Sequence, residues 1–403
     1  MAADPHNVVR LILPRAVPGR PGEEYADAAV LLRQWLADQI LVTDAQPALY
    51  VYEQAVVDDA RASTAHVVQR GLIGLVRLVP PDAGIVLPHE GVWPGPVAGR
   101  LQLMEATQAN LEPIFLLYEG ENLAGNGLAA SNADAVAGIV DAAASGPALV
   151  EAMTDDGLRH RLWAVTSQDD LDAIAADLAP RQALIADGHH RYAAYLRLQE
   201  RRRVAGDGPG PWDYGLALLV DSRRYPPHIG AIHRVIPGLN VKRAAERAAG
   251  AFSVRPIASG SADVLAAMDE LRKASETGPA FVLAGGDDAY LLTEPDPAEA
   301  AAAMPDGSSA PWRALPAAVL QELLLTRVWA LSDDENSVRV VHHDAAEAVR
   351  AARAAGGTAV LCMPMSPGDV YAVAARGEKV PRKSTSFAPK PRTGLVLRTF
   401  AQG

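Results

Sequence analysis

The chain has 403 residues, more than the roughly 100–200 of an ordinary domain, so we expect two or three compact units. Hydrophobic residues make up 49% of the chain and charged residues 21%, which argues against a largely disordered protein. Lysine and arginine number 37 against 48 aspartates and glutamates, and the resulting net charge of −11 disfavours unspecific binding to nucleic acid or anionic membranes.

The expected compartment follows from cysteine usage and hydropathy. The one cysteine, Cys362, allows no intramolecular disulfide, and no apolar run approaches the ~18–20 residues that cross a bilayer. The segment Met1–Asn7 has neither the basic nor the apolar part of an export signal. We therefore expect a soluble protein of the reducing cytoplasm with no membrane partner.

The first half of the chain alternates predicted strands and helices. An apolar run over 8–13, ended by Pro14, predicts a strand, and apolar residues at helical spacing over 25–40 predict a helix. Residues 55–65 predict a loop, and the Ala-, Gly- and Asn-rich residues 121–150 predict a loop followed by an exposed helix. Further strands are predicted at 47–53, 66–79, 113–118, 158–165 and 183–186, and further helices at 100–110, 169–178 and 191–203.

The second half follows a Gly- and Pro-rich linker at 205–213. A hairpin is predicted over 280–292, and residues 295–312 form a low-complexity Ala, Pro and Ser stretch. Further strands are predicted at 216–221, 338–341, 360–362 and 395–397, and helices at 264–273 and 317–331. This mixture of strands, helices and hairpins predicts an α+β or mixed α/β fold and argues against a doubly wound parallel sheet.

The sharpest motif is Asp187-Gly188-His189-His190-Arg191. A buried strand ends, Gly188 permits a tight turn, and a helix begins at once, so backbone N–H groups and the positive helix end face one point. The imidazoles and the guanidinium add donors suited to phosphate oxygens. The alternative is a helix capped by Asp187 with both histidines merely exposed. A zinc site is disfavoured, because adjacent histidines point about 100° apart on a helix.

A second motif is Leu87-Pro88-His89-Glu90-Gly91, which precedes a Gly- and Pro-rich stretch. A carboxylate beside a histidine, on a loop fixed by proline, suits a general base or a metal ligand. Exposed glutamates are common in loops, and an ordinary surface position is the interpretation that these residues alone favour.

A third segment, 381–394, holds four cations and four hydroxyls within fourteen residues. Such a loop suits contacts to phosphate, although its glycine spacing is not that of a Walker A motif. The alternative is a solvated basic tail, but the apolar residues 395–397 that follow predict an ordered segment. The candidates for phosphate contact are Lys383, Ser384, Thr385 and Lys390, and His233 and Arg234 after Gly230 are candidates to line a cleft.

Four segments together resemble the domain-of-unknown-function 1015 family over essentially the whole chain; they are Leu87–Glu90, Asn110–Phe115, Asp187–Ala193 and Lys383–Lys390. The Asp-Gly-His-His-Arg element of this family is similar to the phosphate-binding motif of the ParB/sulfiredoxin-like superfamily, to which free L-serine kinases belong. The resemblance implies a ParB/sulfiredoxin-like nucleotide-binding core that uses ATP or ADP with Mg²⁺. It also implies transfer of the ATP γ-phosphate to free L-serine, giving O-phosphoserine.

The resemblance implies roles for individual residues as well. Glu90 would accept the hydroxyl proton, and Asp187 would orient the serine or bind a Mg²⁺ ion. Phosphoryl transfer depends mainly on positioning and charge neutralisation, which these residue types supply. The phosphates would be held by Gly188, His189, His190, Arg191, Lys383, Ser384, Thr385 and Lys390, and the substrate shell would include His89, His233 and Arg234.

Residues 1–240 would form the catalytic core, and residues 241–403 an α/β extension that contributes the Lys-Ser-Thr loop. Family members usually begin with a further segment carrying a Pro-Pro-Tyr-Asp-Val element, so either the start codon is misassigned here or a first strand and loop are missing.

A competing hypothesis is a nucleotide-sensing protein without phosphoryl transfer. It predicts tight nucleotide binding through His190 and Arg191, and nucleotide-dependent self-association as a homodimer. Nucleic-acid processing is disfavoured by the net charge and by the lack of basic residues interleaved with aromatic ones. The acceptor, the nucleotide and the oligomeric state stay open at this point.

Overall fold

The computed structural model describes residues 4–402 except 17–18, 21, 58–65, 121–134, 258–263, 333 and 335–336. The chain divides into two compact units, one formed by Met1–Pro227 with Pro389–Gly403 and the other by His228–Ala388. The expected boundary after residue 240 falls inside the second unit, because β10 (His228–Ile229) and β11 (Ile232–Ile236) pair with strands of that unit. The end of the chain belongs to the first unit.

The first unit is built on an eight-stranded sheet of order β3-β8-β5-β9-β2-β1-β7-β6. Two of its strand pairs, β3 with β8 and β5 with β9, are parallel, and the others are antiparallel. The strands are β1 (Leu49–Val56), β2 (His66–Arg77), β3 (Val86–Leu87), β5 (Ile114–Tyr118), β6 (Val150–Met153), β7 (Leu158–Val165), β8 (Ala183–Asp187) and β9 (Tyr214–Asp221). A separate pair joins β4 (Ala109–Asn110) to β18 (Arg398–Thr399).

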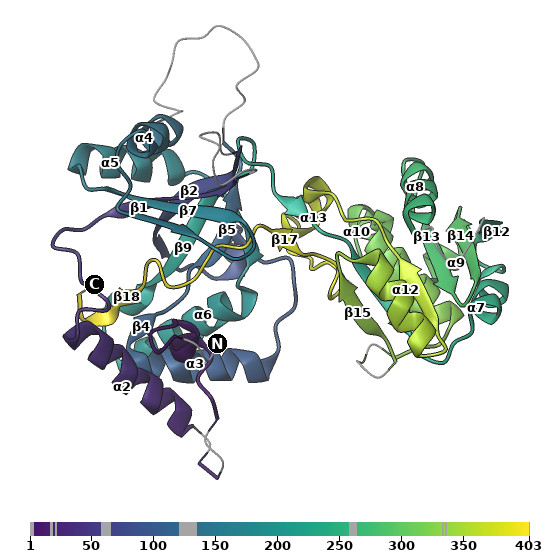
Figure 1. Cartoon of the computed structure of the whole chain (residues 1–403), viewed down its shortest axis with the longest axis horizontal. Coiled ribbons are helices and arrows are strands. Elements are labelled where there is room, and N and C mark those ends of the chain that lie inside the picture. The colour runs from purple at the N-terminus through teal and green to yellow at the C-terminus, as the bar shows by residue number, and fades with distance from the viewer. Residues whose placement is uncertain are drawn as a thin grey trace, which may run out of the picture. The chain divides into compact units, whose positions relative to one another are not determined.

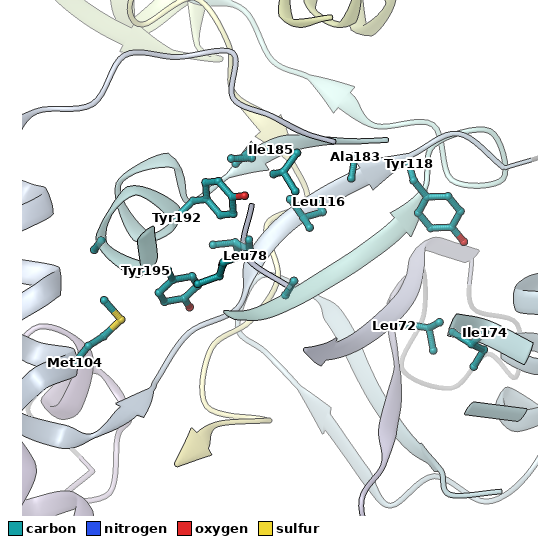
Figure 2. Close-up of a cluster of buried hydrophobic side chains, with 14 of the residues drawn as sticks. Leu72, Leu78, Met104, Leu116, Tyr118, Ile174, Ala183, Ile185, Tyr192 and Tyr195 are labelled. Atoms are coloured by element: carbon teal, nitrogen blue, oxygen red, sulfur yellow. The ribbon is translucent and has the colours of Figure 1, made fainter. Parts of the chain in front are cut away.

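Helices cover both faces of this sheet, with α4 and α5 on one face and α3 and α6 on the other (Figure 1). Tyr192 and Tyr195 of α6 lie in the buried cluster that also holds Leu116 and Ile185 of the sheet (Figure 2). This packing fixes the start of α6 against β5 and β8. The helices are α1 (Val9–Ile12), α2 (Glu23–Ala37), α3 (Pro94–Thr107), α4 (Ala135–Ala144), α5 (Gln168–Leu178) and α6 (His189–Ala205), with short 3₁₀ turns at Pro81–Ala83, Pro211–Asp213 and Phe400–Gln402.

The second unit contains a six-stranded antiparallel sheet of order β12-β14-β13-β16-β11-β15, and β10 pairs with β17 (Phe387–Ala388) beside it. Its remaining strands are β12 (Ser253–Ile257), β13 (Phe281–Gly285), β14 (Asp288–Thr293), β15 (Arg339–His342) and β16 (Thr358–Leu361). Its helices are α7 (Val241–Ala248), α8 (Val264–Ser275), α9 (Pro297–Ala303), α10 (Ala310–Ala314), α11 (Pro316–Ala318), the π-helix Val319–Val328, α12 (Ala345–Ala354) and α13 (Pro367–Ala374).

The fold is mixed α/β, as the sequence predicts, and most expected elements are present. The hairpin β13–β14 turns between Gly285 and Asp288, as expected. The helix expected after residue 121 is α4, whose Val136 and Val140 are buried rather than exposed. The loop expected before it at 121–134, and most of the one at 55–65, lie outside the described residues. None of the helices in the described ranges is both long and apolar enough to cross a bilayer.

Two expected strands are wrong. Residues 8–13 contain helix α1, because the Asn7 side chain accepts a hydrogen bond from Val9 N at 3.0 Å and one helical face buries Leu11 and Ile12. A short apolar run fits a buried strand and a buried helix equally well, so the sequence pattern does not separate them. Residues 395–397 are irregular, and the strand lies at Arg398–Thr399, where it pairs with β4.

Candidate active site

The turn between β8 and α6 has the geometry that its sequence predicts. Gly188 adopts a left-handed conformation with φ of 101°, which favours glycine. A Cβ at this position would lie 3.0 Å from Ile114 Cγ2, so the close approach to β5 also favours glycine. The helix begins at His189, immediately after the turn, and its positive end is therefore directed at the carboxyl end of β8.

The loop that carries Glu90 lies at the carboxyl ends of the strands, on the same side of the sheet as the turn at Asp187. Strand β3 pairs with β8 in parallel, with Val86 opposite Ala183 and Leu87 opposite Leu184. The carboxyl ends of parallel strands lie on the same side of the sheet, so the residues after Leu87 and those after Asp187 leave the sheet side by side. Glu90 is half-buried in this loop. The sheet therefore brings the second sequence motif to the first.

The two histidines of the turn hold this loop by its backbone. His89 N donates to His189 Nε2 at 3.3 Å, and Trp93 N donates to His190 Nε2 at 3.0 Å. The ring of His189 is buried edge-on against that of His89, with ring centroids 4.5 Å apart. The His189 ring therefore serves to fix the loop, and the expectation that this imidazole faces a phosphate does not fit its burial.

His89 is fully buried. Burial lowers its pKa from 6.5 to about 4, although a hydrogen bond with the Ile185 backbone and the charge of Asp187 oppose the shift. The imidazole is neutral at physiological pH for this reason. A neutral buried ring suits the packing of the loop better than contact with an anionic substrate.

Asp187 is held between two cations. Arg191 binds its Oδ2, and Lys390 Nζ donates to its Oδ1 at 2.7 Å. Arg191 also donates to the carbonyl oxygen of Pro113, in the segment Asn110–Phe115 that the sequence singled out. Asp187, Arg191 and Lys390 together carry one net positive charge, which suits an anion next to the positive helix end.

These residues do not fit a magnesium site held by protein ligands. Both oxygens of Asp187 already bind cations, and the described part of the chain contains no group of three or more His, Cys, Asp and Glu side chains that would hold a metal ion. Magnesium is commonly bound by substrate phosphates and water, with few protein ligands. The ion-binding role expected for Asp187 is therefore not supported by its contacts.

The other expected site residues, Lys383, Ser384, Thr385, His233 and Arg234, belong to the second unit. Arg234 is buried and donates to Lys383 O at 3.0 Å, and the buried Ser384 hydroxyl donates to Pro381 O. His233 Nδ1 accepts from Cys362 N at 3.2 Å, and burial lowers its pKa to about 4. His233 and Arg234 thus stabilise the interior and the Lys383 loop, in place of the cleft that the sequence predicts for them.

The family model for the protein of unknown function DUF1015 matches residues 1–318. The chain belongs to the DUF1015 family. No curated protein matches its sequence. Among solved structures, this DUF1015 protein is similar to a free serine kinase in complex with AMP, at 14% identity and a TM-score of 0.37, covering 78% of this chain and 87% of that one.

Two further solved structures are similar to this chain at comparable sequence identity and TM-score. A conserved hypothetical protein from Pyrococcus furiosus has 13% identity and a TM-score of 0.38, covering 82% of this chain and 96% of that one. SbnI with a C-terminal truncation from Staphylococcus aureus has 13% identity and a TM-score of 0.36, covering 79% and 84%. Similarity at this level assigns no activity to the DUF1015 chain, whose site is argued from its own contacts.

Sequence reasoning missed the residues that support Lys390. Tyr52 and Gln54 of β1 are fully buried, and both form hydrogen bonds to the backbone of residues 390–392. A signal was present in the sequence, since Glu53 and Gln54 interrupt an otherwise apolar strand. Buried polar side chains in a central strand require partners, and the pattern alone does not say which.

Proposed function

We propose that this DUF1015 protein is an ATP-dependent phosphotransferase acting on a small hydroxyl compound, with a ParB/sulfiredoxin-like nucleotide-binding core. The observation that carries the proposal is the parallel pairing of β3 with β8, which sets the Glu90 loop beside the turn at Asp187. A carboxylate is thereby available next to a strand–glycine–helix turn with two cations. Phosphoryl transfer needs this combination of positioning, positive charge and a nearby base.

In the proposed reaction, Gly188 and the first turn of α6 bind the phosphates through backbone N–H groups. Arg191 and Lys390 neutralise charge on the transferring group, and Asp187 positions both cations. Glu90 accepts the proton of the acceptor hydroxyl as its oxygen bonds to the γ-phosphorus and the bond to the β-phosphate oxygen breaks, releasing ADP. His189 and His190 keep the Glu90 loop in place.

Free L-serine is the first acceptor to test, because the resemblance of the Asp187–Arg191 motif to that of free L-serine kinases implies it. Lys383, Ser384 and Thr385 belong to the second unit, in a loop whose backbone Arg234 holds, and the proposed reaction assigns them no role. The proposed setting is the cytoplasm, where ATP and free amino acids occur together.

A nucleotide-binding regulator without phosphoryl transfer is the second candidate. The observation that favours it is the full engagement of Asp187 by Arg191 and Lys390, since a carboxylate held by two cations serves binding as readily as catalysis. This candidate keeps the phosphate contacts and gives Glu90 no chemical role.

The purified protein incubated with MgATP and a panel of amino acids, followed by mass spectrometry, tests the proposal. We expect phosphoserine and equimolar ADP. Arg191→Gln should weaken ATP binding about 10–100-fold, the worth of a charge-assisted hydrogen bond. Arg201→Gln, an exposed position later on α6, is the matched control and should leave binding unchanged. ATP binding without any phosphorylated product would support the regulator, and absence of ATP binding would contradict both functions.

A further inference from the structure

The C-terminal segment 389–397, here called the strap, is anchored to one face of the first unit's sheet (the yellow trace that ends at β18 in Figure 1). Gln54 Nε2 donates to Lys390 O at 3.1 Å, and Arg392 N donates to the Tyr52 hydroxyl oxygen at 3.1 Å. Both anchoring side chains come from β1 and are fully buried. The strap is thus bound through its backbone, and the side chains of Lys390 and Arg392 add ion pairs with Asp187 and Asp156.

The two anchors set the register of the strap. Tyr52 and Gln54 are two residues apart on one strand, so they share a face and lie roughly 7 Å apart. The strap positions that they bind, 390 and 392, are also two residues apart. A slip by one residue would place either Pro391 or Thr393 at Tyr52, and of these two only proline lacks an N–H to donate. Pro391 therefore excludes the slip in one direction, and the paired hydrogen bonds at 390 and 392 define the observed register.

A buried polar network supports both anchors. Gln69 Nε2 donates to Gln54 Oε1 at 2.8 Å, and the Tyr52 hydroxyl lies 2.9 Å from His160 Nδ1. Since the Tyr52 oxygen accepts from Arg392 N, its proton is directed to His160. Burial lowers the pKa of His160, which keeps that ring neutral and able to accept. Burying so many polar groups is costly unless each finds a partner, and such networks serve to specify one arrangement.

This register determines where the Lys390 ammonium lies. Side chains alternate along an extended segment, so a slip by one residue would turn Lys390 to the opposite side. In the observed register, Lys390 Nζ lies 2.7 Å from Asp187 Oδ1, across the same carboxylate from Arg191. Lys390 itself is mostly exposed, so its own packing does not hold it there.

We propose that Tyr52 and Gln54 are positioning residues that fix the strap in the one register placing the Lys390 ammonium beside the phosphate-binding turn. This inference rests on the proposed phosphotransferase function and adds the source of its second cation. Lys390 is the group that touches the transferring phosphoryl, and Tyr52 and Gln54 act only through it.

A double-mutant cycle tests this dependence. Lys390→Met should lower kcat/KM about 100-fold, as loss of a charge partner in the transition state does, and Gln54→Leu about 10-fold through misplacement. If Gln54 acts through Lys390, the double variant should be no worse than Lys390→Met alone. Independent, multiplying losses would overturn the proposal. Lys390→Arg should restore part of the activity in the wild-type background and less in Gln54→Leu.

A second experiment needs no catalytic activity and separates this inference from the proposed function. Hydrogen exchange of the peptide covering 389–397 should speed up in Tyr52→Phe and in Pro391→Ala, which admits the slipped register. Tyr50→Phe is the matched control, because Tyr50 lies on the same strand but its hydroxyl binds Asp44 before the strand, and it should leave exchange unchanged. Unchanged exchange in Tyr52→Phe would refute the anchoring role. A wild-type protein that transfers no phosphate would refute the function, and the cycle is then repeated on ATP affinity, where additivity again overturns the inference.

Discussion

Strand β1 carries buried polar side chains on both faces, and the two faces use different chemistry. On one face Glu53 lies directly between Arg70 of β2 and Arg161 of β7, and each guanidinium binds one of its oxygens. On the other face Tyr52 and Gln54 bind the strap through neutral hydrogen bonds. The charged face also holds helix α4, because Arg70 pairs with Asp141 at 2.8 Å.

Buried charged groups and buried neutral groups serve different purposes in this unit. A buried charge is tolerated only while its partners remain, so the Glu53 cluster makes the unit depend on each of its members. A neutral network adds little net free energy, because both partners were hydrogen-bonded to water before folding, but it selects one register. We therefore expect changes on the charged face to affect stability and changes on the strap face to affect the site.

The largest expected effect is that of Glu53→Gln. The variant keeps the shape of the side chain but leaves Arg70 and Arg161 without their shared counter-charge, which should lower the free energy of unfolding by about 3–5 kcal/mol. Urea unfolding followed by circular dichroism measures it. Glu200→Gln removes an exposed partner of Arg203 on α6 and should leave the midpoint unchanged. Equal urea midpoints for both variants would contradict the expectation that the charged face of β1 contributes to stability.

A fall in pH should destabilise the first unit through its buried neutral histidine His89. The folded pKa of His89 is about 4 and its unfolded value is 6.5, so the unfolded chain binds the proton first as the pH falls. The contribution of His89 to the free energy of unfolding is fully present above pH 6.5. It is lost as the pH falls towards 4, which lowers the free energy of unfolding by about 3 kcal/mol. His89→Gln should flatten that decline, whereas His66→Gln, at an exposed position, should not. An unaltered pH profile for His89→Gln would contradict the burial argument.

The smallest expected effect is that of the double variant Gln54→Leu with Gln69→Leu. It removes the Gln69 donor together with its Gln54 acceptor and loses only the hydrogen bond to Lys390 O, so the free energy of unfolding should fall by less than about 1.5 kcal/mol. The same variant should still lose the placement of Lys390. A loss of stability as large as that of Glu53→Gln would show that the strap face carries stability rather than register.

Much of the fold could be predicted from the sequence because the information is local. The strand ending at Asp187, the glycine at 188 and the helix after it follow from residues adjacent in the chain. The pairing of β3 with β8 could not be predicted, since β3 has only two residues and its partner lies far along the sequence. Burial likewise decided the roles of His189 and His233, whose residue types alone suggest ligand contact.

Single-turnover transfer of γ-labelled phosphate at saturating ATP and serine tests most directly whether the Glu90 loop and the Asp187 turn form one catalytic site. The site predicts that Glu90→Gln binds ATP as the wild type does and slows the transfer step by about 100–10,000-fold, the usual contribution of a general base. Transfer at the wild-type rate in Glu90→Gln, or a wild-type protein that transfers nothing to any hydroxyl acceptor, would contradict it.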